Sequence, residues 1–114
     1  MIQRIEEDKD GPVEVSGRTV LTATITGKLT VLEAAELQLR GEVRGDVVVR
    51  RGGALIVTGR IKGAIFNEGG AVDVFGFVGR VEDVGPTQTF VSRGAIIGGK
   101  RASRPSKLST FLHT

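Results

Sequence analysis

The chain has no cysteine, tryptophan or tyrosine, and its only histidine is His113, next to the last residue. Without cysteine it can form neither a disulfide framework nor a thiolate metal site. A single histidine in this position cannot supply a Ser–His or Cys–His pair inside the body of the chain, so nucleophilic catalysis of the usual kind is not expected. We therefore predict a protein that is not an enzyme and has no catalytic, cofactor-binding or metal-binding residues.

Long apolar segments are also missing. No stretch approaches the roughly 18 apolar residues of a transmembrane helix, and residues 1–8 lack the apolar core of a signal peptide. These absences predict a cytoplasmic protein with no membrane span.

The formal net charge of +3 conceals two charged ends. Residues 98–114 contain four basic residues and no acidic one, whereas residues 1–10 contain four acidic residues and two basic ones. A basic tail can bind nucleic acid, but it is more often a solvated segment. We therefore expect a protein partner rather than a nucleic acid.

Glycine, in contrast, is abundant, at 17 of 114 residues, and it recurs within an eighteen-residue repeat. The copies begin at Ala23, Gly41 and Gly59, and the third copy is one residue shorter. Aliphatic residues follow at a spacing of six: Ile25, Val31, Leu37, Val43, Val49, Leu55 and Ile61. Six residues per side and three sides per turn predict an all-β fold, a single-domain triangular parallel β-helix (β-solenoid) with about 18 residues per coil and strands of about two to five residues.

The repeat also divides the chain. We assign residues 1–22 to an N-terminal opening strand and cap, residues 23–97 to the β-solenoid repeats, and residues 98–114 to a basic C-terminal tail, either mobile or strapped across the open end. Glycine pairs such as Gly41 and Gly45 recur with the repeat and predict tight corners. Charges of opposite sign eighteen residues apart are expected to stack in neighbouring coils: Glu33 with Arg51, Arg50 with Glu68, and Glu42 with Arg60.

Alignment of the copies places four of the five phenylalanines at outward positions late in the stack. Phe75 aligns with Arg40 and Thr58, and Phe77 aligns with Glu42 and Arg60. Clustered exposed apolar side chains on a soluble protein usually mark an interface. The alternative is that the tail, with Leu108, Phe111 and Leu112, folds back and covers them. The candidate protein-binding residues are Phe66, Phe75, Phe77, Arg60, Arg80 and Phe90.

Two further motifs are weaker. Residues 94–100 match the first seven positions of a phosphate-binding loop, but Arg101 stands where a magnesium-binding Ser or Thr is required, and Pro105 would break the helix that should follow. The acidic residues near positions 6–8 and 82–83 lack the spacing of a calcium loop. We interpret the first motif as a coincidence of a glycine-rich chain and the second as solvated charge.

The recurring unit Gly-x-Val-x-Gly-x-Val, at residues 41–47 and again at residues 59–65, resembles that of bactofilins, which are bacterial polymer-forming cytoskeletal proteins. The likeness covers about residues 23–97. It implies a right-handed triangular β-helix and a structural protein that associates with itself. Fewer clean coils than in that family and the Gly85-Pro86 insertion are departures that bear on end-to-end filament growth.

Two functions of different classes follow. The first is a bactofilin-like structural protein that self-associates. The second is an immunity-type protein that binds and neutralises a cognate bacterial toxin. The repeat favours the first, and the exposed phenylalanines favour the second. In both the partner is a protein, either this chain itself or a toxin.

Overall fold

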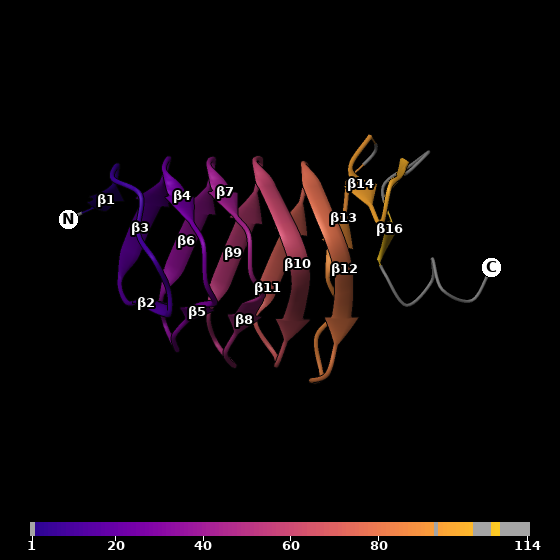
Figure 1. The fold of residues 1–114 in the computed structure, drawn as a ribbon. Helices are drawn as coiled ribbons and strands as arrows, with labels where there is room; N and C mark the ends of the chain where they lie inside the picture. The colour runs from indigo at the N-terminus through magenta and orange to yellow at the C-terminus, as the bar shows by residue number, and fades with distance from the viewer. Residues whose placement is uncertain (1, 93, 102–105, 108–114) are drawn as a thin grey trace.

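The computed structural model describes residues 2–92, 94–101 and 106–107. Every helix or strand element assigned in these residues is a β-strand. The strands stack in parallel as a β-solenoid of about five turns, with equivalent positions about 18 residues apart. Figure 1 shows the coils side by side along one axis, from the N-terminal coil at the left to the last strands at the right. The β-helix predicted from the repeat is therefore confirmed.

The strands lie on three faces of the stack, which we number in the order in which each repeat reaches them. The first face contains β4 (Thr24–Ile25), β7 (Glu42–Val43), the first parts of β10 (Arg60–Asn67) and β12 (Phe77–Asp83), and β14 (Ile96–Ile97). The second face contains β2 (Val13–Val15), β5 (Leu29–Val31), β8 (Val47–Val49) and the later parts of β10 and β12. The third face contains β1 (Ile2–Ile5), β3 (Arg18–Leu21), β6 (Glu36–Leu39), β9 (Ala54–Val57), β11 (Ala71–Val74) and β13 (Phe90–Val91).

Two strands are longer than the sequence predicted. β10 has 8 residues and β12 has 7, because each continues around the corner at which the earlier coils break. Their pairing shifts register between Ile61 and Ala64, and an Asp46 carboxylate oxygen accepts a hydrogen bond of 2.8 Å from the Ala64 amide there.

The solenoid winds in a right-handed sense. In Figure 1 the near strands β10 and β12 run downward and the far strands run upward as the chain advances to the right.

The core is a set of aliphatic columns that run along the axis. Leu29, Val47 and Ile65 are stacked in register and fully buried, as the alignment of the copies predicted. The residues predicted inside at the spacing of six are buried as well: Ile25, Val31, Leu37, Val43, Val49, Leu55 and Ile61. The inward side chains of all coils form one continuous buried cluster, so stacking of neighbouring coils completes the core.

One inward column turns polar in the third copy. Val31 pairs with Val49, but the next member is Asn67, which is fully buried. Its side-chain oxygen accepts hydrogen bonds from the amides of Gly69 (3.1 Å) and Gly70 (2.8 Å). This side chain therefore satisfies the backbone of the corner that follows it.

The two ends of the stack differ in how their strands pair. At the C-terminal end, β15 (Lys100–Arg101) pairs with β14 and β16 (Ser106–Lys107) pairs with β13, both antiparallel. The part of the tail that the structure describes therefore lies across the last coil, and the rest of residues 98–114 lies outside the described residues. At the N-terminal end, parallel pairing already begins at Ile2, within the segment that the sequence assigned to an opening strand and cap.

Candidate protein-binding surface

The most exposed phenylalanines flank one corner of the solenoid. Phe75 follows β11 at the end of the third face, and Phe77 begins β12 on the first face, with Gly76 between them. Phe75 is 49% exposed and Phe77 is 44% exposed. The corner turns sharply because a Cβ on Gly76 would collide with the carbonyl oxygen of Gly59 in the coil before. The chain therefore presents two aromatic rings on either side of a tight bend.

A cation covers one of these rings. The Arg60 guanidinium lies 4.9 Å from the centroid of the Phe77 ring, and the two residues are partners in the parallel pairing of β10 with β12. This distance is within the range of a cation–π interaction. Ile96 is the partner of Phe77 on the other side, in β14. Phe77 is thus held between a basic side chain and an aliphatic one.

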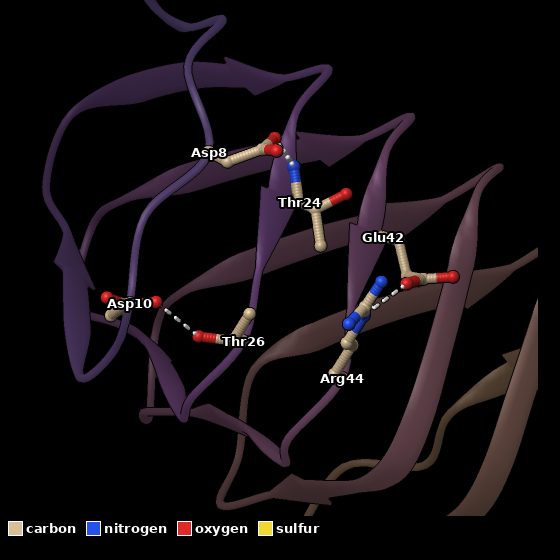
Figure 2. A network of polar contacts seen from close by, with 6 residues as sticks. All are labelled: Asp8, Asp10, Thr24, Thr26, Glu42 and Arg44. Carbon is tan, nitrogen blue, oxygen red and sulfur yellow. Dashed lines mark hydrogen bonds and ion pairs between the residues drawn. The ribbon is translucent and has the colours of Figure 1, made fainter.

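Arg60 does not form the stacked ion pair that the sequence predicted with Glu42, although the two residues are in register. Glu42 instead accepts a hydrogen bond of 2.9 Å from Nε of Arg44, two residues along the same coil (Figure 2). This hydrogen bond, helped by the positive charges of Lys62, Arg44 and Arg60, holds the pKa of the Glu42 carboxyl below its usual value. Because Arg44 satisfies Glu42, Arg60 is left to lie over Phe77.

Of the other two predicted columns, Arg50 and Glu68 do pair, at 3.4 Å. The ion pairs described in residues 2–92 do not include Glu33 with Arg51. Both residues lie in the exposed corner after the second face, where the side chains are free to point into solvent.

An open groove of about 450 Å³ runs along this part of the first face. Its walls are Arg60, Ile61, Lys62, Phe77, Val78, Gly79, Ile96 and Gly99. The cations Arg60 and Lys62 therefore share one surface with the apolar side chains of Phe77 and Ile96. A side chain that combines an apolar body with a carboxylate would satisfy both kinds of wall.

The remaining candidate residues lie on other faces. Phe66 is the partner of Val48 on the second face, where the Arg80 guanidinium lies 6.0 Å from its ring centroid and also pairs with Glu82 at 2.8 Å. Phe90 is half-buried on the third face, as the partner of Asp73. The structure therefore brings Phe75, Phe77 and Arg60 together around one corner, and places Phe66 with Arg80, and Phe90, apart from them.

The opposite end of the first face carries charge that the sequence alignment did not include. Lys9 is bridged to Ile25, which places Asp8 and Asp10 next to Thr24 and Thr26 (Figure 2). Asp8 accepts a hydrogen bond of 2.9 Å from the Thr24 amide, and Asp10 accepts one of 3.0 Å from the Thr26 hydroxyl. The acidic residues of the run 6–10 were visible in the sequence. Alignment at eighteen residues did not place them, because this segment pairs with the next coil at an offset of sixteen residues.

No protein-family model matches the chain, and neither the search of curated proteins nor the search of solved structures finds a match. Among the described residues there is no helix long and apolar enough to cross a membrane. The same residues contain no group of three or more His, Asp or Glu side chains placed to hold a metal ion.

Proposed function

We propose that this protein is a non-catalytic β-solenoid scaffold that acts through protein–protein contacts, and that it self-associates as a bactofilin-like structural protein. The repeat supports self-association, and one observation carries the proposal of a protein–protein contact. Two phenylalanines, each more than two-fifths exposed, flank the Gly76 corner, and a guanidinium lies over one of them. Aromatic side chains and arginine are the residues most enriched at the energetic centres of protein interfaces.

The ends of the stack indicate that this contact is made by the side of the solenoid. At the N-terminal end, Gln3 and Lys9 occupy positions that are inward in the next coil, where Thr19 and Ile25 are buried. At the C-terminal end, antiparallel strands break the parallel repeat. Polar side chains and a change of strand direction are both devices that discourage a further coil from docking.

The double variant Phe75→Ser, Phe77→Ser tests the proposal by sedimentation velocity over a range of protein concentrations. We expect the wild type to show a concentration-dependent dimer or larger species, and the variant to sediment as a monomer with an unchanged melting temperature. The matched control is Val84→Ser, which removes another exposed apolar side chain, 60% exposed, from a loop away from the corner. Equal loss of association in the control would show that the corner has no special part in it.

A second candidate is an immunity-type protein that neutralises a bacterial toxin. The short stack, with polar side chains at one end, antiparallel strands at the other and one aromatic corner on its side, offers a compact surface for covering an active site. Co-expression with a toxin encoded next to this gene distinguishes the two functions. The second candidate requires that the wild type restores growth, that the Phe75→Ser, Phe77→Ser variant does not, and that the purified wild type remains monomeric.

A further inference from the structure

The first face carries opposite charges at two separate levels of the stack. The N-terminal coil presents the exposed acids Asp8 and Asp10, and the next coil presents the neutral Thr24 and Thr26. In the coil after that, Glu42 and Arg44 neutralise each other at 2.9 Å. The following coil presents Arg60 and Lys62, both exposed. The face thus has two outward negative charges at one level, with Lys9 between them at the inward position, and two positive charges three levels further along.

These charges are too far apart to neutralise each other within one molecule. Neighbouring coils are about 4.8 Å apart, so three levels span about 14 Å. That is longer than the Debye length of about 8 Å at physiological ionic strength. Arg60 lies over the ring of Phe77, and no described acidic residue forms an ion pair with either Arg60 or Lys62.

A second copy turned end for end satisfies both levels at once. We infer that the self-association proposed above is an antiparallel, side-by-side dimer in which Asp8 and Asp10 of each copy lie against Arg60 and Lys62 of the other. A two-fold axis between the second and third levels brings the acidic level of each copy opposite the basic level of its partner. It also brings the threonines of each copy opposite the Glu42–Arg44 pair of the partner. The interface is then self-complementary, as a two-fold contact requires.

The aromatic corner has a place in this arrangement. Phe77 lies one level beyond Arg60, so it lies at the edge of this interface, beside the contact of Arg60 with Asp8 and Asp10 of the partner, and Phe75 lies on the adjoining third face. The two Phe77 rings then lie at opposite ends of the same interface. This inference rests on the proposed self-association, and it names the second copy and the orientation in which that copy docks.

The first face is narrow, so electrostatics has a large share in such a contact. Its strands β4, β7 and β14 have two residues each. Stable interfaces bury about 800 Å² per partner, which a face of this width does not supply from backbone and short side chains alone. The dimer is therefore expected to be weak and sensitive to salt.

Charge reversal with rescue tests the pairing by sedimentation velocity in low salt. We expect Arg60→Glu, Lys62→Glu to weaken the dimer by about tenfold or more, because it brings like charges together. Asp8→Asn, Asp10→Asn should also weaken it, while each amide oxygen can still accept the hydrogen bond from Thr24 or Thr26. Mixing Arg60→Glu, Lys62→Glu with Asp8→Lys, Asp10→Lys should restore a one-to-one heterodimer. The matched control, Arg40→Glu, Arg51→Glu, makes the same change of charge off this face and should dimerise as the wild type does.

The results distinguish the proposed self-association from the antiparallel pairing that rests on it. If Arg60→Glu, Lys62→Glu dimerises like the wild type while Phe75→Ser, Phe77→Ser does not, self-association stands and the antiparallel pairing is wrong. A wild type that remains monomeric at low salt and high concentration overturns both. Loss of dimer in the reversed variant without rescue in the mixture also rejects this pairing, because Arg60 and Lys62 would then dock on a part of the second copy other than Asp8 and Asp10.

Discussion

The coils on either side of Gly59 follow different rules. From β5 to β9 the pairing holds an offset of eighteen residues, and the inward columns are wholly aliphatic. From β10 onward the offset to the next coil varies between sixteen, seventeen and nineteen residues, and the pairing of β10 with β12 shifts register once. Asn67 also enters an inward column there. The exposed phenylalanines also lie in this later part. The regular coils show what the fold requires, and the later coils show how much departure it tolerates.

The shortened corner shows how the departure is absorbed. In the earlier coils a backbone hydrogen bond closes this corner, from the Ala35 amide to the Leu32 carbonyl at 3.1 Å and from the Gly53 amide to the Arg50 carbonyl at 2.9 Å. In the third copy one residue is missing, and the Gly70 amide donates to the Asn67 side chain instead. A side chain thus replaces a lost piece of backbone, as asparagine does in turns.

The largest effect is expected from Gly59→Ala in the regular stack. An added Cβ would collide with the carbonyl oxygen of Gly41, which is backbone and cannot swing away. We expect a cost of about 3 kcal/mol or more in the free energy of unfolding, measured by urea denaturation. The control is Gly52→Ala, where the nearest atom is 3.9 Å away and only the positive φ of +81° opposes the change, at about 1 kcal/mol. Equal costs would show that close approach of the coils does not select glycine.

Asn67→Val makes the irregular coil resemble the regular ones in sequence. If the apolar column were all that mattered, the variant would be more stable. We expect the reverse, a loss of about 2 kcal/mol, because the amides of Gly69 and Gly70 lose their acceptor in the interior. Thermal and urea denaturation measure the change, and an increase in stability would show that the shortened corner does not depend on this side chain.

Truncating one side chain of the same inward column in each region compares the packing of the regular coils with that of the later coils. Val47→Ala removes a fully buried side chain between two intact coils, and we expect it to cost about 1.5 kcal/mol. Val81→Ala removes a 6% exposed side chain from the same column near the C-terminal end, where we expect a smaller loss. A larger cost at Val81 would mean that the later coils carry more of the stability than the earlier ones.

Thr19→Val, in the strand β3 that precedes the regular part, is expected to stabilise the stack. Thr19 is 1% exposed, and its hydroxyl finds no hydrogen-bond partner among the described residues. Valine has nearly the same shape and no polar group to desolvate, so we expect a gain of about 1 kcal/mol. A fall in the melting temperature would indicate that the hydroxyl is satisfied in solution by a bound water molecule.

The smallest effect concerns pH. The pKa of Glu42 is held below its usual 4.5, so its pairing contributes stability above pH 4.5 that is lost as the pH falls through the lowered value. We expect the carboxyl titration of Glu42, followed by NMR, to show this lowered pKa and to return toward 4.5 in the variant Arg44→Ala. An unchanged titration would show that Arg44 does not hold the carboxyl in solution.

Most of the fold could be predicted because the physics repeats. Inward residues at a spacing of six, such as Val43 and Leu55, mark both the period and the core. The same series reaches residue 67 and meets an asparagine, which is the one visible sign of the polar corner. Periodicity could not predict its role, because the replacement of a backbone acceptor by a side chain depends on the three-dimensional path of a shortened turn.

The candidate surface was predictable in part. Alignment of the repeat copies predicted that Phe75 and Phe77 point outward. It could not predict which outward positions lie close together, because that depends on how the backbone turns at the corner between them. It also could not predict the partner of Arg60. Glu42 is in register with Arg60 but closer along its own coil to Arg44, and only the geometry decides between these neighbours.

The glycine corner has a consequence for growth of the chain by gene duplication. Gly41, Gly59 and Gly76 each sit against a carbonyl of the preceding coil that would collide with a Cβ, whereas Ala23 occupies this corner in the first copy. A coil duplicated from the interior can therefore be inserted in frame and extend the stack. A coil duplicated from the first copy would require a mutation of its alanine before it could be placed further along.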